Sequence, residues 1–418
     1  KTARVAQIGA GAWSGDVCNA IMKSKKVELV TCFDVIPEKH QALSDKFGCS
    51  YEASYEDVLK RNDIDAVHLI SPNAVHAEQA ILAARHGKHV FVEKPLANTI
   101  PDAKNTIAAC QKANVVLMVG QHLRRLAGFR KLKALIAGGA IGDPIQVEAN
   151  FSQNLGFALT PESFRWRGDD SGCPAGALMT LGIHHADLLN YLLGPIETVF
   201  AYFNKLYIKA PVEDVNTTIC QFKSGVLGYL GTNYASPKSC WVSVYGTEAN
   251  LRFTVTLQEL PFEAYLLRWQ MIDEDTRLQI FKKDKTGGED ITLNVGNPIL
   301  EEIDEFADCI RTGKKPETDG EGGLQALAFI RAAIESALAH DRKVVVECGL
   351  DAREIECAVL GAEVPEASVP GEIVPGAEFY TYEDKYRDGI AELRIPADLD
   401  PDTAAGVRAS SCAAFRAL

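Results

Sequence analysis

The eleven cysteines of this 418-residue chain include no CxxC pair and no spacing typical of a zinc site. They are scattered along the sequence, so a disulfide framework and a metal centre are both disfavoured. Cysteines of this kind are commonly small buried residues of a core. We therefore predict a reduced, cytoplasmic protein that holds no metal.

Long apolar runs are missing as well, and so is an excess of positive charge. No run approaches the ~20 apolar residues that span a bilayer, and no basic, apolar leader opens the chain. The formal net charge is −13, so we expect neither nucleic acid nor a membrane as a partner. A hydrophobic content of 47% indicates a globular protein, and its length indicates more than one domain.

A short buried strand is predicted close to the start of the chain, and it leads directly into a glycine-rich turn. Gly9 allows the tight turn, and Gly11 lets the backbone approach a pyrophosphate at the start of the following helix. Ser14 replaces the third glycine of the G-x-G-x-x-G pattern. Together with Ala12 and Trp13, this turn predicts a dinucleotide-binding site.

A second predicted strand, residues 27–33, ends at Asp34. A carboxylate at this position accepts hydrogen bonds from both hydroxyls of the adenosine ribose. The same carboxylate would repel a 2′-phosphate, and the next residues, Val35 and Ile36, provide no cation to bind one. We therefore predict NAD as the cofactor in preference to NADP.

Strands and helices then alternate in the βαβ manner, which predicts a parallel sheet. The strand at residues 89–92 ends in Glu93-Lys94-Pro95, and the strand at residues 65–70 ends in Ser71-Pro72-Asn73. Because the carboxyl ends of parallel strands meet at one edge, these residues are expected to converge on the crevice of the glycine turn. Partial desolvation there would favour loss of the Lys94 proton and suit this side chain to acid/base chemistry.

A predicted helix from Ala177 to Leu193 carries a second group of polar residues. At 3.6 residues per turn, Thr180, His184 and Asp187 lie on one face. A histidine beside a hydroxyl and a carboxylate is suited to proton transfer, although a lone histidine on such a helix is more often structural.

These motifs resemble those of the Gfo/Idh/MocA family of NAD(P)-dependent oxidoreductases. The resemblance extends from about Ala3 to Val346, and it rests on Gly9-x-Gly11, Ser71-Pro72-Asn73-x-x-His76, Glu93-Lys94-Pro95 and Gly182-x-His184-x-x-Asp187. It implies an α/β chain, with a Rossmann domain at residues 1–122 and an α+β domain with an open, mostly antiparallel sheet at residues 123–347. The outer face of that sheet commonly packs against another subunit, which implies a homodimer or homotetramer.

The resemblance also implies roles for individual residues, with Lys94 and His184 as the catalytic pair. The cofactor site would comprise Gly9, Gly11, Ala12, Trp13, Asp34, Ser71, Pro72, Asn73, His76, Glu93, Lys94 and Pro95. The substrate site would comprise Lys94, Arg124, Trp166, Arg167, Thr180, His184 and Asp187. Many members carry an aspartate where this chain has Thr180. That departure leaves the proton relay open and disfavours a simple inositol dehydrogenase.

The segment from Phe164 to Asp170 combines Trp166 with two arginines. An indole and cations beside a cofactor crevice suit a sugar, because sugar faces stack on aromatic rings and sugar hydroxyls need charged partners. A solvated loop is an equally good interpretation of the arginines.

The last segment, residues 348–418, carries a net charge of −8. From about residue 350 it resembles an internal piece of the ATP-grasp domain of D-alanine–D-alanine ligases. The piece stops before the metal-binding carboxylates of that family, so a ligase by itself is not expected. A gene fusion, an artefact of cloning or sequence assembly, and a remnant that adds strands elsewhere are three explanations for it.

The predicted function is an NAD-dependent oxidoreductase that acts on a secondary alcohol of a sugar, polyol or sugar derivative, a small-molecule substrate. The alternatives are a cyclic redox enzyme that retains NAD, such as an epimerase or a glycoside-cleaving enzyme, a non-catalytic NAD-binding regulator, and a dihydrodiol dehydrogenase. The identity of the substrate, its reacting carbon and the direction of the reaction stay open.

Overall fold

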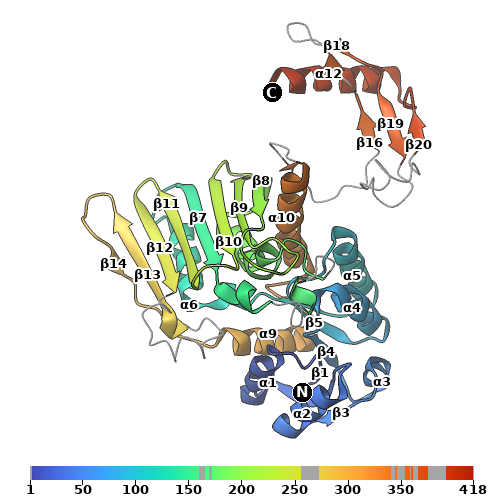
Figure 1. Cartoon of the computed structure of the whole chain (residues 1–418), viewed down its shortest axis with the longest axis vertical. Helices are drawn as coiled ribbons and strands as arrows, with labels where there is room; N and C mark the ends of the chain where they lie inside the picture. Colours follow the sequence, from blue (N-terminus) through green and yellow to red (C-terminus); the bar gives the residue numbers. More distant parts are fainter. Residues whose placement is uncertain are drawn as a thin grey trace. The chain divides into compact units, whose positions relative to one another are not determined.

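The computed structural model describes residues 2–159, 165–168, 172–255, 273–339, 344–345, 354–357, 359–360, 366–374 and 392–417. Phe164 and residues 169–170 of the predicted sugar-contacting segment lie outside these ranges, and so does much of the tail. Internal contacts divide the chain into two compact units, residues 1–348 and residues 349–418. Each unit is coloured by sequence in Figure 1. No helix in the described ranges is both long and apolar enough to cross a membrane.

The first sheet of the first unit has six parallel strands in the order β3-β2-β1-β4-β5-β6. Its strands are β1 (Ala3–Ile8), β2 (Val27–Phe33), β3 (Ser50–Tyr51), β4 (Ala66–Leu69), β5 (His89–Glu93) and β6 (Leu117–Gly120). The strand order reverses between β1 and β4, and in sheets of this kind ligands bind at the carboxyl ends of the strands beside that reversal. The glycine turn after β1 therefore lies at the binding edge.

Five helices connect these strands. They are α1 (Ser14–Lys23), α2 (Pro37–Phe47), α3 (Tyr55–Lys60), α4 (His76–Arg85) and α5 (Ile100–Lys112). The hydroxyls of Ser54 and Thr99 accept hydrogen bonds from Asp57 N and Asp102 N, in the first turns of α3 and α5. These caps satisfy amide groups that have no partner inside the helix. All four residues of β4 are buried, as expected for a strand covered by helices on both faces.

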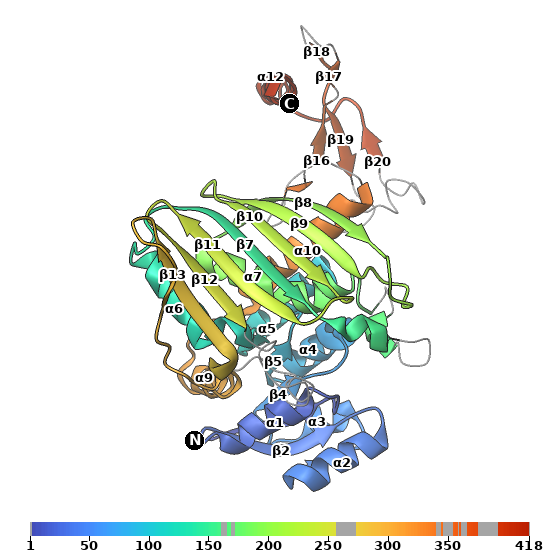
Figure 2. The same ribbon diagram turned by 60° about the vertical axis from the view of Figure 1, so that its left-hand side comes forward.

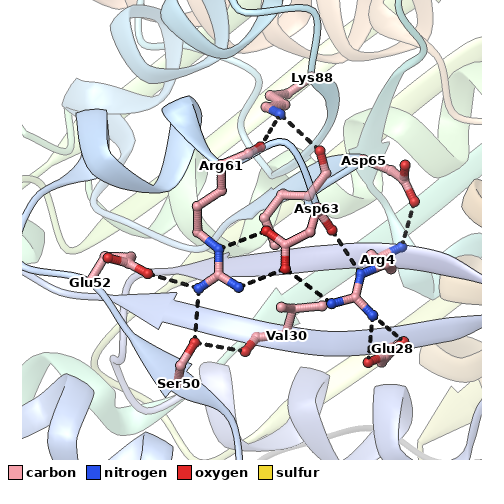
Figure 3. A network of polar contacts seen from close by, with 10 residues as sticks. Arg4, Glu28, Val30, Ser50, Glu52, Arg61, Asp63, Asp65 and Lys88 are labelled. Atoms are coloured by element: carbon pink, nitrogen blue, oxygen red, sulfur yellow. Dashed lines mark hydrogen bonds and ion pairs between the residues drawn. The ribbon is translucent and has the colours of Figure 1, made fainter.

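A network of charged residues links the amino-terminal ends of these strands, at the edge of the sheet opposite the glycine turn (Figure 3). Arg4 pairs with Glu28 over 2.9 Å and with Asp63 over 3.1 Å, and Arg61 pairs with Asp63 over 2.8 Å. Lys88 Nζ donates to the main-chain oxygen of Arg61 over 2.7 Å. Because these residues stand at or just before the starts of strands, the network joins the amino ends of β1, β2, β4 and β5, away from the crevice.

The second sheet of the same unit has nine strands in the order β14-β13-β12-β11-β7-β10-β9-β8-β15. Its strands are β7 (Pro144–Ser152), β8 (Ile196–Asn204), β9 (Val215–Phe222), β10 (Leu227–Asn233), β11 (Ser239–Gly246), β12 (Ala249–Val255), β13 (Thr276–Lys282), β14 (Glu289–Asp290) and β15 (Val344–Val345). Neighbouring strands are antiparallel except β7 and β10, which are parallel. The predicted fold class is confirmed.

Helices cover one face of the second sheet, as Figure 2 shows with the sheet in front of them. They are α6 (Ala127–Ala137), α7 (Ile183–Leu193) and α10 (Gly320–Ala339), and α9 (Pro298–Thr312) packs on α1. Side chains of β9 alternate between buried and exposed positions, so the other face is left open. Because α10 contacts both α5 and β8, one helix joins the two sheets of this unit.

The described part of the second unit contains short strands and one helix. A three-stranded antiparallel sheet has the order β16-β19-β20, and β17 pairs with β18. The elements are β16 (Glu354–Glu356), β17 (Val359–Leu360), β18 (Glu366–Ala367), β19 (Gly371–Val374), β20 (Glu392–Arg394) and α12 (Pro401–Ala417). Arg408 of α12 donates two hydrogen bonds to Ala367 O, so the helix is attached to β18.

Candidate functional site

The glycine turn between β1 and α1 forms one wall of the site. Gly9 has a φ of +93°, and a Cβ atom there would lie 2.6 Å from Ile70 O, so a larger residue would push apart the loops after β1 and β4. A Cβ at Gly11 would meet no atom of the described chain within 4 Å. Gly11 and its neighbour Ala12 are both exposed. The turn therefore offers open backbone to a pyrophosphate.

Asp34 lies beside this turn at the end of β2. Its Oδ2 accepts a hydrogen bond from Ala10 N over 2.7 Å, and its Oδ1 accepts one from Ile36 N over 2.9 Å. Each carboxylate oxygen has a further lone pair, which a ribose hydroxyl can use. The exposed side chains of Val35 and Ile36 follow directly. The position of Asp34 thus fits an adenosine ribose.

The loops after β4 and β5 are joined by the buried ring of His76. Its Nδ1 lies 2.8 Å from Pro95 O, and its Nε2 lies 2.9 Å from Ser71 O. Burial lowers the pKa of His76, while its hydrogen bonds with Pro95 O and Ser71 O oppose that shift, and the ring links the two loops. Asn73, in the same loop behind exposed Pro72, is buried, and its Nδ2 has no hydrogen-bond partner among the described residues. A buried amide left this way is suited to a ligand.

The carboxylate of Glu93 connects the glycine turn to Lys94. Trp13 Nε1 donates a hydrogen bond to Glu93 Oε1 over 2.7 Å, and Lys94 N donates to Glu93 Oε2 over 3.3 Å. Burial raises the pKa of Glu93, while the charge of Lys94 and the Trp13 hydrogen bond oppose that shift. The indole and the carboxylate therefore hold the start of the Lys94 loop against the cofactor turn.

Lys94 extends from the end of β5 toward the helix that carries His184. Its Nζ donates a hydrogen bond to the main-chain oxygen of Thr180 over 3.0 Å. Burial lowers the pKa of Lys94 to about 8, against the opposing effect of Glu93. The amine and ammonium forms are therefore both accessible near neutral pH, as a group that exchanges protons requires.

The helix predicted from Ala177 begins differently in the structure. Residues Leu178–Gly182 form a π-helical turn, and the α-helix starts only at Ile183. A π-helical turn holds more residues than an α-helical turn, so the simple 3.6-residue spacing does not apply between Thr180 and His184. Turns of this type occur frequently at functional sites, and this one presents the Thr180 carbonyl to Lys94.

His184 is buried next to a second histidine, His122, with the two ring centroids 5.2 Å apart in an edge-to-face arrangement. Burial, followed by the nearby charge of Lys94, lowers the pKa of His184 well below its usual value. Burial likewise lowers the pKa of His122 to about 3. Both rings are therefore neutral at neutral pH, whereas Lys94 is mostly protonated. Such a difference separates an acid from a base.

Asp187 and Arg124 occur as a buried pair. Arg124 Nε donates to Asp187 Oδ2 over 2.9 Å, and Arg124 Nη2 contacts Asp187 Oδ1. Burial raises the pKa of Asp187, while Arg124 opposes that shift. These two residues, both predicted to bind the substrate, thus form an ion pair one turn beyond His184. Their contact with a substrate stays a prediction.

Trp166 and Arg167 lie together in the short described segment Arg165–Gly168. The Arg167 guanidinium carbon is 4.3 Å from the centroid of the Trp166 ring. The charge of Arg167 also contributes to the lowered pKa of Lys94, which places this stacked pair on the Lys94 side of the site.

Two residues close to the site were not singled out from the sequence. His122 stands two residues after β6, and its ring centroid lies 5.1 Å from that of Trp13. Its place at the carboxyl end of a parallel strand was a usable signal. Tyr234 contacts Thr180 through their hydroxyls. Tyr234 directly follows β10 of the second sheet and lies 54 residues after Thr180 in the chain. No sequence motif marks it.

Within the described ranges, no group of three or more His, Cys, Asp or Glu side chains is arranged to hold a metal ion. The residues around the crevice instead fit a dinucleotide. Gly11 supplies open backbone, Asp34 supplies a ribose acceptor, and Asn73 supplies a donor that has no partner among the described residues.

Comparison with known proteins agrees with this geometry. A family model described as an oxidoreductase family with an NAD-binding Rossmann fold matches residues 3–121, and a Gfo/Idh/MocA C-terminal domain model matches residues 129–252. A crystal structure assigned as an NADPH-dependent oxidoreductase from Desulfitobacterium hafniense is 32% identical, with a TM-score of 0.77, and the match covers 83% of this chain and 98% of that one. The chain belongs to the Gfo/Idh/MocA family. It is an NAD(P)-dependent oxidoreductase of the class that acts on CH–OH groups.

A curated relative and a second solved structure are similar over most of their length. The 1,5-anhydro-D-fructose reductase of Ensifer adhaerens is 28% identical over 327 residues, which cover 77% of this chain and 92% of the reductase. A levoglucosan dehydrogenase in complex with NADH has the same fold, with 24% identity, a TM-score of 0.72 and coverage of 83% of this chain and 100% of that chain.

A third family model, the C-terminus of D-Ala–D-Ala ligases, matches residues 323–418. The predicted resemblance of the tail is therefore confirmed, but the match begins inside α10 rather than at about residue 350. In the structure α10 packs against α5, α7 and β8 of the oxidoreductase unit.

Proposed function

We propose that this protein is an NAD-dependent oxidoreductase that acts on a secondary alcohol of a sugar, polyol or sugar derivative. Lys94 and His184 are its acid/base pair. The proposal rests chiefly on one observation: Lys94, with a pKa lowered to about 8, stands at the carboxyl end of β5 close to a neutral, buried His184. Two groups with different protonation at neutral pH suit proton transfer to and from a hydroxyl.

The preference for NAD over NADP is supported by Asp34. Its carboxylate is held beside the glycine turn by Ala10 N and Ile36 N. A 2′-phosphate at this place would meet a negative charge and the apolar side chains of Val35 and Ile36, so its binding is disfavoured.

The nicotinamide, when bound, accepts or supplies the hydride. The protein would bind the whole dinucleotide along the glycine turn, Asp34 and the loops after β4 and β5, with the nicotinamide near Lys94. Lys94 would accept the hydroxyl proton during oxidation and donate it during reduction. The hydroxyl has a single proton, so His184, neutral because of its burial, would either accept this proton in place of Lys94 or donate a hydrogen bond to the hydroxyl oxygen while Lys94 accepts it. Glu93 would hold the Lys94 loop through its bond from Trp13.

A carbohydrate substrate is supported by two kinds of observation. The reductase and the dehydrogenase named above act on 1,5-anhydro-D-fructose and levoglucosan. In this chain Trp166 and Arg167 form a stacked pair on the Lys94 side of the crevice. An aromatic face with an adjacent cation is suited to the ring and hydroxyls of a sugar.

The domain roles and the assembly form part of the same proposal. Residues 1–122 bind the cofactor, residues 123–347 bind the substrate and a second subunit, and residues 348–418 are an additional tail. The open face of the second sheet exposes Tyr202, Ile219 and Leu227, an apolar surface that suits a homodimer or homotetramer. A cytoplasmic location is supported by the free cysteines of the described residues.

A panel of sugars, sugar acids and polyols, assayed for NADH formation, tests this proposal. The Lys94→Ala variant should bind NADH yet lose at least about a hundredfold in kcat, whereas Lys131→Ala, at an exposed site of α6, should behave as wild type. Near-normal kcat in Lys94→Ala would refute the role of Lys94. Turnover that needs no added NAD, with cofactor retained through purification, would favour the cyclic redox alternative.

A further inference from the structure

The hydroxyl of Thr180 has two neighbours that together determine its hydrogen bonding. It donates to the main-chain oxygen of Gly176 over 3.1 Å, and it contacts the hydroxyl of Tyr234. Gly176 O cannot donate, so the single proton of Thr180 is committed to it. The contact with Tyr234 must then be a hydrogen bond in which Tyr234 donates and Thr180 accepts.

This order of donation ends at a carbonyl. Tyr234 donates to Thr180, Thr180 donates to Gly176 O, and an amide oxygen does not carry a proton onward at neutral pH. Burial raises the pKa of Tyr234, which keeps the phenol protonated and able to donate. The hydroxyl of Thr180 is therefore unsuited to relay a proton from the substrate.

The backbone of Thr180 performs a different task. Its carbonyl oxygen accepts the hydrogen bond from Lys94 Nζ over 3.0 Å. Its side chain anchors the same residue to Gly176 on the preceding turn and to Tyr234 on the second sheet. Thr180 thus connects a rigid part of the fold to the amine of Lys94.

Tyr234 itself is fixed at several points. Its side chain is fully buried among Leu159, Leu181 and Val212. Its backbone amide donates to Asp214 O over 2.8 Å, and its carbonyl accepts from Gly156 N over 3.0 Å. A side chain held in this way gives its hydrogen-bond partner a constant position.

We propose that Tyr234 is a positioning residue for Lys94, acting through Thr180, whose carbonyl oxygen it holds at the Lys94 ammonium. This inference rests on the proposed role of Lys94 and adds the element that orients it. When Lys94 is an amine, one N–H points to Thr180 O, so its lone pair is directed away from the π-helical turn. Tyr234 and Thr180 would together orient the Lys94 amine, which in a chain with an aspartate at residue 180 the carboxylate could orient directly.

The Tyr234→Phe and Thr180→Val variants test this role. Each removes part of the anchor, so Thr180 O should move away from Lys94 and stabilise the ammonium less. The pKa of Lys94 should fall by about half a unit to one unit, and kcat for the active sugar should fall about tenfold or more. The Kd for NADH should stay within about twofold of wild type, because the variants do not touch the cofactor turn.

The pKa of Lys94 is measured without a substrate, by competitive acetylation at several pH values followed by mass spectrometry of the peptide that contains Lys94. Thr180→Ser keeps the hydroxyl and should restore the Lys94 pKa. Tyr55→Phe is the matched control, because Tyr55 is a buried tyrosine that donates to Gln79 O over 2.8 Å in another part of the fold. It should lose stability without a change in the Lys94 pKa.

An unchanged Lys94 pKa in both Tyr234→Phe and Thr180→Val would overturn the inference. An equal shift in Tyr55→Phe would also overturn it, because the effect would then be a general loss of stability. If no sugar in the panel is turned over, the proposed function fails, yet the acetylation measurement still decides the role of Tyr234.

Discussion

Asp187 on α7 and Arg124, in the 3-10 turn after β6, form an ion pair in which both partners are almost fully buried. Two contacts join the guanidinium to the carboxylate, and Arg124 Nη1 also donates to Glu317 O over 3.2 Å. The pair connects the dinucleotide-binding sheet to the helix that carries His184. It therefore fixes the distance between the two halves of the site.

We expect the Asp187→Asn variant to be strongly destabilised. The substitution leaves the Arg124 charge buried without its counter-ion, which typically costs about 3 to 5 kcal/mol. Urea unfolding followed by circular dichroism measures the change. Asp63→Asn is the control, because Asp63 forms its ion pairs with 46% of its side chain exposed and such pairs contribute about 1 kcal/mol or less. Equal losses in both variants would contradict the importance of burial at Asp187.

The rates of oxidation and reduction should depend on pH in opposite ways as the pH passes the pKa of Lys94. Oxidation needs the amine form, so its kcat should rise as the pH increases through about 8. Reduction needs the ammonium form, so its kcat should fall over the same range. Initial rates with the best sugar and with its ketone, measured from about pH 6 to 10, test this. Parallel profiles in both directions would exclude Lys94 as the titrating group.

Replacing Lys94 by methionine should stabilise the protein while abolishing turnover. The pKa of Lys94 is lowered from 10.5 to about 8 in the folded protein. Below about pH 8 the side chain is an ammonium in both the folded and the unfolded chain, and its burial then opposes folding fully. The penalty declines as the pH rises from about 8 toward 10.5. At neutral pH the Lys94→Met variant should gain about 1 to 3 kcal/mol in free energy of unfolding.

Urea unfolding of Lys94→Met at neutral and at alkaline pH tests this prediction. The gain should become smaller at high pH, and Lys131→Met on the exposed face of α6 should give no comparable gain. A Lys94→Met variant less stable than wild type at neutral pH would mean that the ammonium contributes net stability.

The Asp34→Ala variant should lose affinity for NADH and lose its discrimination against NADPH. Removal of the ribose acceptor should raise the Kd for NADH about tenfold or more, since a hydrogen bond to a charged group contributes about 1.5 to 3 kcal/mol. Adding Val35→Arg should supply a cation for the 2′-phosphate and favour NADPH. Fluorescence titration with both cofactors measures the change, and the exposed Glu38→Ala serves as control. Unchanged affinities in Asp34→Ala would remove the basis for preferring NAD.

The parts of the fold that depend on local patterns were predictable from the sequence. The strand expected at residues 89–92 is β5 (His89–Glu93), and the strand expected at residues 27–33 is β2 (Val27–Phe33). In both, the apolar residues of the strand itself carry the signal. The place of Lys94 at the carboxyl edge follows from the strand order alone, because all six strands are parallel.

Contacts between distant residues were not predictable in the same way. Arg124 and Asp187 are 63 residues apart, and Thr180 and Tyr234 are 54 apart. The first contact depends on how α7 packs on the turn after β6, and the second on how the π-helical turn packs on β10, and no single segment encodes either. The π-helical turn at Leu178–Gly182 was also missed, because an added residue in one turn leaves the apolar pattern almost unchanged.

The hydrogen bond from Trp13 Nε1 to Glu93 Oε1 has an optical consequence. It fixes one of four tryptophans at the mouth of the crevice, where a reduced nicotinamide would absorb the light that an indole emits. Binding of NADH should therefore quench the emission of Trp13 and sensitise that of the cofactor. The protein thus carries an internal fluorophore for following cofactor exchange in real time, and Trp13→Phe should weaken the signal.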